Sequence, residues 1–362
     1  MKRNIIVVLM ILCFLLTGCQ SGKEKEQKTA NVETAQRTSF PESYQYTGER
    51  VVMNIETIEP GEAYFINGTA MSFKLDGKSI GRMFMPEDGT NVLDEERRWI
   101  LSEEMVDDAH NEIFMWGDIS FSYTTYQTNK LADSIRETKD GWDYNLPVYK
   151  EKKEFSFGTA EEALEEIIIF LEKAGIQLGE NYKADIFYLD YETLREQERY
   201  YDAFGNVVEA EQPHEWSEAD NAYLFYIHQT YCELEDYHHN RTAGSGVAED
   251  FNSQITVIYN AEGIVNIHVG HLSTYTMGST QEELLDFETI ADKVSEYFDY
   301  MLGDSTYEID SAQLVCKFEE QDSNEIQKII PVWSFHVTET MEDGSEWHYE
   351  KWFHAVTGEC IN

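Results

Sequence analysis

The sequence predicts an α+β protein in which an antiparallel sheet covered by one helix occurs twice, after a small β-rich N-terminal domain. Many short segments alternate apolar and polar residues and end at glycine, proline, asparagine or aspartate, as strands do. Two longer segments, 159–174 and 279–302, instead carry apolar residues at helical spacing. Strand-like segments follow each of them, so the order of helix and then strands is found twice and indicates an internal repeat.

The chain opens with a segment that is typical of exported proteins. Two basic residues precede an apolar run over residues 5–16, and Leu16–Gly18 leads into Cys19. The alternatives are a buried helix or a membrane span, but the run is shorter than the about 20 residues that cross a bilayer. The stretch resembles the lipobox of bacterial lipoproteins. This resemblance implies that residues 1–18 are a signal peptide and that Cys19 carries the lipid.

Residues 19–46 are rich in Ser, Gly, Lys, Glu, Gln and Thr and lack apolar periodicity, so we expect a flexible tether. Residues 47–154 carry mostly strand signals, and the alternation in Asp118–Tyr126 is the clearest of them. One helix is expected in this part, at residues 95–110. We expect residues 47–154 to form the small β-rich domain.

The first helix–sheet unit is expected at residues 155–275. Thr159 and Glu162 have the spacing of a capping box, and Gly175 is expected to end the helix. The strands that should follow cover residues 182–191, 222–232, 255–259 and 264–271.

The second unit is expected at residues 276–362 and repeats this order. Its helix should begin at Ser279-Thr280 and stop at Gly303, and its strands should cover residues 307–319, 329–340 and 347–356. Within the second of these strands, Trp333 shares a face with Phe335 and Val337. Trp333 is therefore expected to be a core residue and not a ligand contact.

The closing residues Ile330–Phe335 and Phe353–Glu359 resemble the end of PepSY-like domains, which often finish with a Pro-x-Trp strand and an Ala-x-Thr-Gly-Glu turn. The arrangement is also similar to the extracytoplasmic α+β units of the YycH and YycI regulators of Gram-positive bacteria. PepSY-like domains are associated with binding and inhibiting partner proteins, often proteases. YycH and YycI engage a sensor kinase through a transmembrane helix, whereas this chain has a lipobox, so the resemblance does not carry that mode of signalling over.

The charge of the chain excludes one large class of partners. The sequence holds 27 basic and 69 acidic residues, which gives a formal net charge of −42. Loss of residues 1–18, which contain two of the basic residues, takes this to −44. Such a field repels nucleic acid and anionic membrane surfaces and favours cationic partners. We therefore expect no nucleic-acid binding.

Catalytic motifs are mostly incomplete in this sequence. His214-Glu215 begins an HExxH pattern, but Glu218 stands where the second histidine of a zinc protease would be. No GxSxG, SxxK or phosphate-binding glycine loop is present. With so many acidic residues, any nominated pair of carboxylates is uninformative without geometry. No catalytic residue and no cofactor are assigned.

Histidines are the remaining candidates for a metal site. His268 and His271 are three apart on a strand and should face opposite sides of it. His336, His348 and His354 have the same parity on the last two strands and could converge on the outer face of the sheet. Exposed cross-strand polar pairs are favoured over a metal site, so no metal ligand is assigned.

The cysteine count does not support a disulfide framework. By the lipoprotein resemblance, Cys13 would leave with the signal peptide and Cys19 would carry lipid, which leaves Cys232, Cys316 and Cys360, an odd number. One bridge and three partly buried thiols are both open, and the thiols are favoured.

Together these patterns predict a lipid-anchored protein on the extracytoplasmic face of the cell membrane that binds a protein partner and is not an enzyme. The alternatives are an envelope glycan-binding module and, third, an envelope hydrolase. An exposed row of aromatic residues beside a groove would favour the glycan module. A buried pair of carboxylates facing a cleft would favour the hydrolase. A smooth sheet face with hydrophobic edge strands would favour protein binding.

Overall fold

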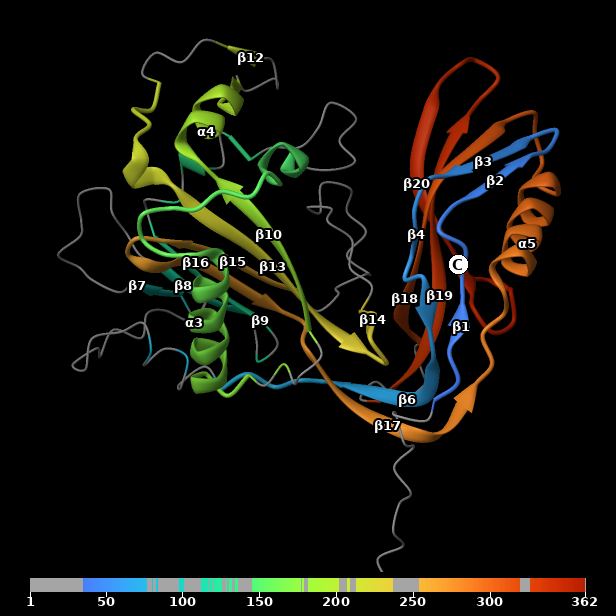
Figure 1. The fold of residues 1–362 in the computed structure, drawn as a ribbon, viewed down its shortest axis with the longest axis horizontal. Helices are drawn as coiled ribbons and strands as arrows, with labels where there is room; N and C mark the ends of the chain where they lie inside the picture. Colours follow the sequence, from blue (N-terminus) through green and yellow to red (C-terminus); the bar gives the residue numbers. More distant parts are fainter. Residues whose placement is uncertain are drawn as a thin grey trace, which may run out of the picture.

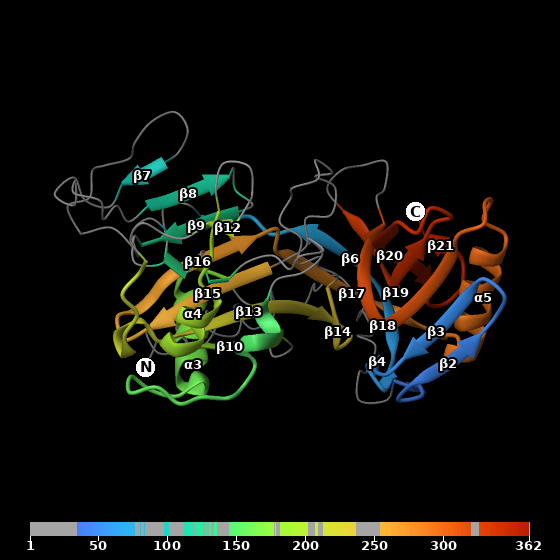
Figure 2. The same ribbon diagram turned by 90° about the horizontal axis from the view of Figure 1, so that it is seen from above.

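The computed structural model gives a mixed α+β protein made mostly of strands, which confirms the α+β class that the sequence predicts (Figure 1). Two large sheets form two units that lie side by side (Figures 1 and 2). The structure describes residues 35–76, 80, 83, 98–100, 112–116, 118, 120–125, 128, 130–131, 134–135, 145–176, 178, 182–201, 207–208, 213–236, 254–319 and 326–361.

The first unit is an eight-stranded sheet whose paired strands are all antiparallel. Its order is β10-β13-β15-β16-β9-β8-β7, and β14 pairs with β13 at the end of the sheet. The bounds of its strands are β7 Arg98–Ile100, β8 Glu112–Trp116, β9 Ser120–Thr124, β10 Tyr182–Leu189, β13 Ala222–Tyr231, β14 Leu234–Glu235, β15 Gln254–Asn260 and β16 Gly263–Gly270.

The second unit is a nine-stranded sheet with the order β17-β6-β19-β18-β3-β2, in which β20 pairs with β19 and β21, and β4 pairs with β18. Strand β18 pairs in parallel with β3 and β4, and its pairing with β19 is antiparallel. The bounds are β2 Tyr44–Thr47, β3 Val51–Ile55, β4 Ile58–Glu59, β6 Phe65–Ser72, β17 Ser273–Glu282, β18 Thr306–Glu319, β19 Gln327–Thr340, β20 Glu346–His354 and β21 Cys360–Ile361.

The remaining elements are short or helical. Two small ladders pair β1 with β5 and β11 with β12. The bounds are β1 Thr38–Ser39, β5 Glu62–Ala63, β11 Tyr200–Tyr201, β12 Val207–Val208, the 3-10 helices η4 Leu146–Tyr149 and η5 Glu218–Asp220, and the α-helices α3 Ala160–Lys173, α4 Tyr191–Gln197 and α5 Phe287–Asp299. No helix in the described ranges is both long and apolar enough to cross a membrane.

Helix α3 begins where the sequence predicts, and its predicted capping box is confirmed. The Thr159 hydroxyl accepts a hydrogen bond from the Glu162 amide, and the Glu162 carboxylate accepts one from the Thr159 amide at 2.9 Å. Apolar residues of one helix stripe, including Ile167 and Leu171, are buried against the eight-stranded sheet. The capping box thus gives hydrogen-bond partners to backbone N–H groups that the first turn of the helix leaves unpaired. The apolar stripe buries nonpolar surface against the sheet.

Replacing Thr159 with alanine should lower the free energy of unfolding by about 1 kcal/mol, because the Glu162 amide loses its acceptor. Urea unfolding followed by circular dichroism measures the change. The exposed Thr274 on β17 is the matched control, and Thr274→Ala should change stability much less. Equal losses in the two variants would show that the cap contributes nothing specific.

Helix α5 begins later than predicted, because residues from Ser279 onward first complete strand β17. The Gln281 position pairs with Ile66 of β6, and the Thr280 amide donates to the Asn67 side chain at 3.0 Å. The helix starts only at Phe287, after Asp286 accepts a hydrogen bond from the Thr289 amide. Pairing with a strand far away in sequence has overridden the local helix-start signal.

The expected N-terminal domain of residues 47–154 is not a separate domain. Strands β3, β4 and β6 belong to the nine-stranded sheet, while β7, β8 and β9 extend the eight-stranded sheet. Each group covers an edge that the other strands would leave unpaired. Of the helix expected at 95–110, residues 98–100 form strand β7, and the other residues lie outside the described ranges. The signal peptide and most of the tether, residues 1–34, also lie outside them.

A β-hairpin of the first unit is built into the core of the second. Tyr231, Cys232 and Leu234, at the turn between β13 and β14, are buried among core residues of the nine-stranded sheet. The Tyr231 hydroxyl donates to the Ile66 carbonyl oxygen of β6 at 3.0 Å. Strands β6 and β17 also run between the two units in Figure 1. The hairpin and these strands therefore hold the units against each other.

Candidate functional site

Helix α5 packs on one face of the nine-stranded sheet, and the opposite face, toward the other unit, carries polar residues beside an apolar cluster of Val315, Ile330 and Val332 (Figure 1). On the helix side, Phe287 of α5 contacts Trp333 of β19, with ring centroids 5.0 Å apart. Residues of opposite parity on the same strands therefore point away from α5. We call their polar members the histidine face, which consists of Asp310, Ser334, His336, His348 and Glu350.

A β-bulge positions one partner of this face. The register between β18 and β19 shifts between Ile309 and Ser311, so Asp310 is the extra residue. Its carboxylate lies 2.7 Å from Nδ1 of His336 and accepts the hydrogen bond of that nitrogen. A bulge redirects a side chain in this way. The imidazole of His336 is therefore held in one orientation by a residue that strand alternation would not have placed beside it.

The second histidine is held by its cross-strand neighbour. Nδ1 of His348 lies 3.0 Å from the hydroxyl of Thr338, directly opposite it in the sheet. The His336 and His348 rings are parallel within 9°, with centroids 6.0 Å apart. The predicted convergence on the outer face is thus confirmed for these two residues. His354 lies six residues further along β20, where Nδ1 accepts a hydrogen bond from the Val356 amide.

The polar side chains of the histidine face are joined in pairs. The Ser334 hydroxyl donates to the Glu350 carboxylate at 2.9 Å, while His336 donates to Asp310. Within the described residues, no group of three or more His, Cys, Asp or Glu side chains could hold a metal ion. The arrangement gives a set of polar pairs fixed by the sheet, in which Ser334 is buried.

The other candidate histidines are half-buried. Burial lowers the pKa of His268, and His271 lowers it further through its charge, so the two imidazoles lie within electrostatic reach. His271 has a positive φ of 51°, which ends the strand alternation that predicted opposite sides. Burial also lowers the pKa of His354. His214, of the incomplete HExxH pattern, packs beside Trp216 with ring centroids 5.7 Å apart.

The cysteines that the structure describes are thiols. Cys232 and Cys316 are buried at the junction of the two units, and Cys360 is half-buried on β21. Burial raises the pKa of Cys232 to about 11, which keeps its thiol protonated and unreactive at neutral pH. Cys19, the predicted lipidation site, lies outside the described residues.

A cluster of exposed apolar residues follows the end of α5 and was not predicted from the sequence. Tyr300 is 85% exposed and Leu302 is 99% exposed, with Met301 between them. Arg50 holds this loop, because its guanidinium donates to the carbonyl oxygens of Met301 at 2.7 Å and Ser305 at 3.1 Å. The exposed side chains are therefore presented by an anchored backbone.

Trp347 of β20 lies at the same end of the unit and is 63% exposed. Trp347 pairs with Glu339, and Glu339 pairs with Tyr307 on the next strand. The ring of Phe298, at the end of α5, packs against the ring of Tyr307 with centroids 4.6 Å apart. Trp347 also shares parity with Phe353, which faces the helix. We call Tyr300, Met301, Leu302 and Trp347 the apolar tip. A run of three apolar residues just before Gly303 is the sequence signal that could have indicated it.

Comparison with known proteins gives a likeness of fold. No family model matches the chain, and no curated protein matches it. A solved structure of an uncharacterized protein from Eubacterium rectale ATCC 33656 is similar, with a TM-score of 0.58 and 15% sequence identity. The match covers 89% of this chain and 94% of that chain. At this identity the likeness concerns the fold alone.

Proposed function

We propose that this chain is a lipid-anchored binding or regulatory protein that acts, without catalysis, on a protein partner at the extracytoplasmic face of the cell membrane. The apolar tip is the observation that supports partner binding most directly. Leu302 leaves almost its whole side chain in water, Tyr300 is exposed two residues before it, and Trp347 is exposed at the same end of the unit. Gathered exposed apolar side chains mark interaction sites, and aromatic residues are enriched in protein interfaces.

We also propose that the two helix-covered sheets are an internal repeat of the PepSY-like kind. In the first unit, α3 is followed by β10, β13, β15 and β16, which are neighbours in that order. In the second unit, α5 is followed by β18, β19, β20 and β21, again as successive neighbours. This shared order is the support for the repeat.

Site-specific photo-crosslinking in the cells that produce the protein tests the partner proposal. A photoreactive residue at Leu302 should crosslink one specific protein. The same residue at Met71, which is 47% exposed on β6, serves as the matched control and should not capture it. Capture of the same protein from both positions, or of none from Leu302, would contradict docking at the apolar tip.

A glycan-binding module is the second candidate, because two exposed aromatic rings, Tyr300 and Trp347, belong to the apolar tip. Aromatic rings with an apolar body and a polar edge suit stacking on sugars as well as protein contacts. Titration with soluble cell-wall fragments, followed by tryptophan fluorescence, separates glycan binding from protein binding. A saturable change that Tyr300→Ala abolishes would favour the glycan module.

Anchoring through Cys19 has its own test. Cys19→Ala removes the thiol to which the acyl chains would attach, so the protein should accumulate as an unprocessed precursor or be released from the membrane. Two acyl chains anchor stably where one would not. Membrane fractionation and the mass of the N-terminal peptide measure this, with Cys13→Ala as the control that should be processed normally. Unchanged attachment and processing of Cys19→Ala would overturn the anchor.

A further inference from the structure

Strand β10 is an edge of the eight-stranded sheet in the described part of the chain. It pairs with β13 on one side and ends the strand order on the other. The strand pairing of residues 182–187 is with β13. Alternate N–H and C=O groups of an edge strand point away from its neighbour and can pair with another strand.

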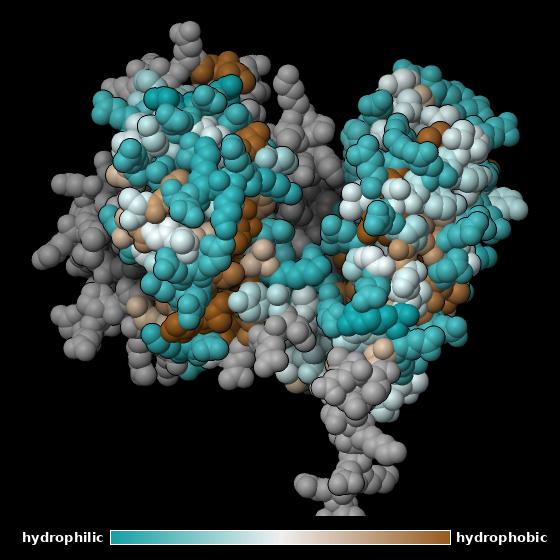
Figure 3. Space-filling model, in the orientation of Figure 1, coloured by the Kyte–Doolittle hydropathy of each residue, from teal (hydrophilic) through white to brown (hydrophobic). Residues whose placement is uncertain are grey.

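An apolar groove runs beside this edge. Glu166 on one flank of α3 bonds to the Tyr259 hydroxyl of β15 at 2.5 Å, which turns that flank toward the middle of the sheet. Leu164 and Ile168 lie on the opposite flank, toward β10. They are only partly buried, as are residues of β10 such as Ile186. Figure 3 shows apolar residues as a band between α3 and β10.

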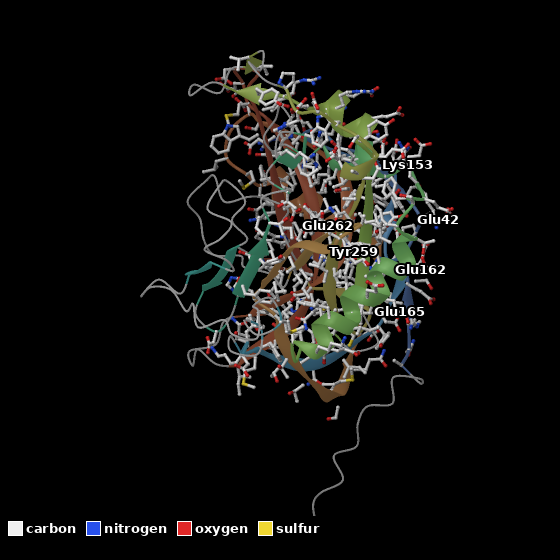
Figure 4. The ribbon with its side chains drawn as sticks, turned by 90° about the vertical axis from the view of Figure 1, so that its left-hand side faces the viewer. Glu42, Lys153, Glu162, Glu165, Tyr259 and Glu262 are labelled. Atoms are coloured by element: carbon white, nitrogen blue, oxygen red, sulfur yellow. The ribbon has the colours of Figure 1, made fainter. Side chains whose placement is uncertain are left out.

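The rim of the groove on α3 is acidic. Glu165 and Glu172 occupy the exposed side of the helix, next to the flank that carries Leu164 and Ile168, while Glu161 on the same side forms an ion pair with Lys152 at 2.7 Å. Figure 4 shows Glu165 projecting from α3. An occupant of the groove would therefore gain from lysine or arginine side chains at its rim.

We propose that the groove between α3 and β10 binds an extended, basic segment of a protein partner, which adds to β10 as a further strand. Main-chain hydrogen bonds to β10 supply affinity, and alternate apolar side chains of the segment enter the groove against Ile168 and Ile186. The side chains between them place lysine or arginine near the acidic rim. This surface lies on the other unit from the apolar tip and is independent of docking there.

A short peptide that alternates valine and lysine is the probe. It should bind the mature protein with an affinity that falls as salt is raised, and it should slow hydrogen exchange at β10 amides. The same sequence with alternate backbone nitrogens methylated cannot complete the ladder and should bind at least about tenfold more weakly. Equal binding of both peptides would overturn strand addition.

Two neighbouring isoleucines of α3 give the matched variants. Ile168→Gln places an amide in the groove and should weaken peptide binding about tenfold. Ile169→Gln changes a residue that is 42% exposed on another side of the helix and should leave binding within about twofold. Equal affinities of the two variants would show that the peptide binds through charge alone, and the proposal would be wrong. If the protein instead bound no peptide but associated with itself, and Ile168→Gln abolished that association, the occupant of the groove would be a second copy of the chain and the proposal would be wrong.

Discussion

Trp333→Ala should lower the free energy of unfolding by about 3–5 kcal/mol, the cost typical of removing a buried tryptophan. The side chain of Trp333 is fully buried and lies between Phe40, at 4.9 Å, and Phe287 of α5, at 5.0 Å. Its removal would leave a cavity exactly where the N-terminal segment, the helix and the sheet meet. The loss should be measurable by urea unfolding and as a lower melting temperature.

Trp347 is the matched control for this prediction, because it is a tryptophan of the adjacent strand that is mostly exposed. Trp347→Ala should change stability by less than about 0.5 kcal/mol. Trp333→Phe should cost less than Trp333→Ala, since it keeps a ring and removes an indole N–H that has no hydrogen-bond partner among the described residues. A stable Trp333→Ala protein that loses only partner binding would move the functional site into this core.

Features that depend on neighbouring residues were predicted correctly from the sequence. The parity of Trp333, Phe335 and Val337 places all three in the core, because side chains alternate strictly along a strand. The Thr159–Glu162 capping box depends on residues three apart. Both signals lie within one element, so no knowledge of distant partners was required.

Features that depend on distant pairing were not predicted. Sheet membership of the N-terminal strands β3, β4 and β6 is decided by partners more than two hundred residues away, as where Val51 pairs with Tyr307. The same holds for β17, where pairing with β6 displaced the expected helix start. Helix α4 was not predicted, because its cap at Asp190 and one buried residue, Leu194, give a weak signal.

For the candidate surfaces, too, local features were predicted from the sequence, and features that depend on distant pairing were not. Parity predicted that His336 and His348 share a face, but the bulge that brings Asp310 to His336 leaves no local signature. His354 has the same parity as these two histidines and was therefore expected beside them, but parity does not show how far apart residues lie along a strand. The apolar tip depends on Trp347 lying level with the end of α5, a relation that is set by the sheet register.

Gly68→Ala should destabilise the junction of the two units by about 1–3 kcal/mol or more, the range for forcing an atom into a packed site. A Cβ atom at Gly68 of β6 would lie 2.0 Å from the Tyr231 hydroxyl oxygen and 2.9 Å from the Thr276 carbonyl oxygen of β17. Tyr231 is anchored there by its hydrogen bonds to Ile66 and Asn67, so its ring cannot move aside freely.

The double variant isolates the contact between β6 and the inserted hairpin. Tyr231→Val removes the ring that the new methyl group meets, so Gly68→Ala should cost less in that background than in the natural chain. Gly61→Ala is the control, because a Cβ atom there meets nothing within 4 Å. Hydrogen exchange should rise at hairpin residues 231–236 in Gly68→Ala before it rises in strands far from the junction. Additive costs, or unchanged exchange in the hairpin, would show that the two units are held together by other contacts.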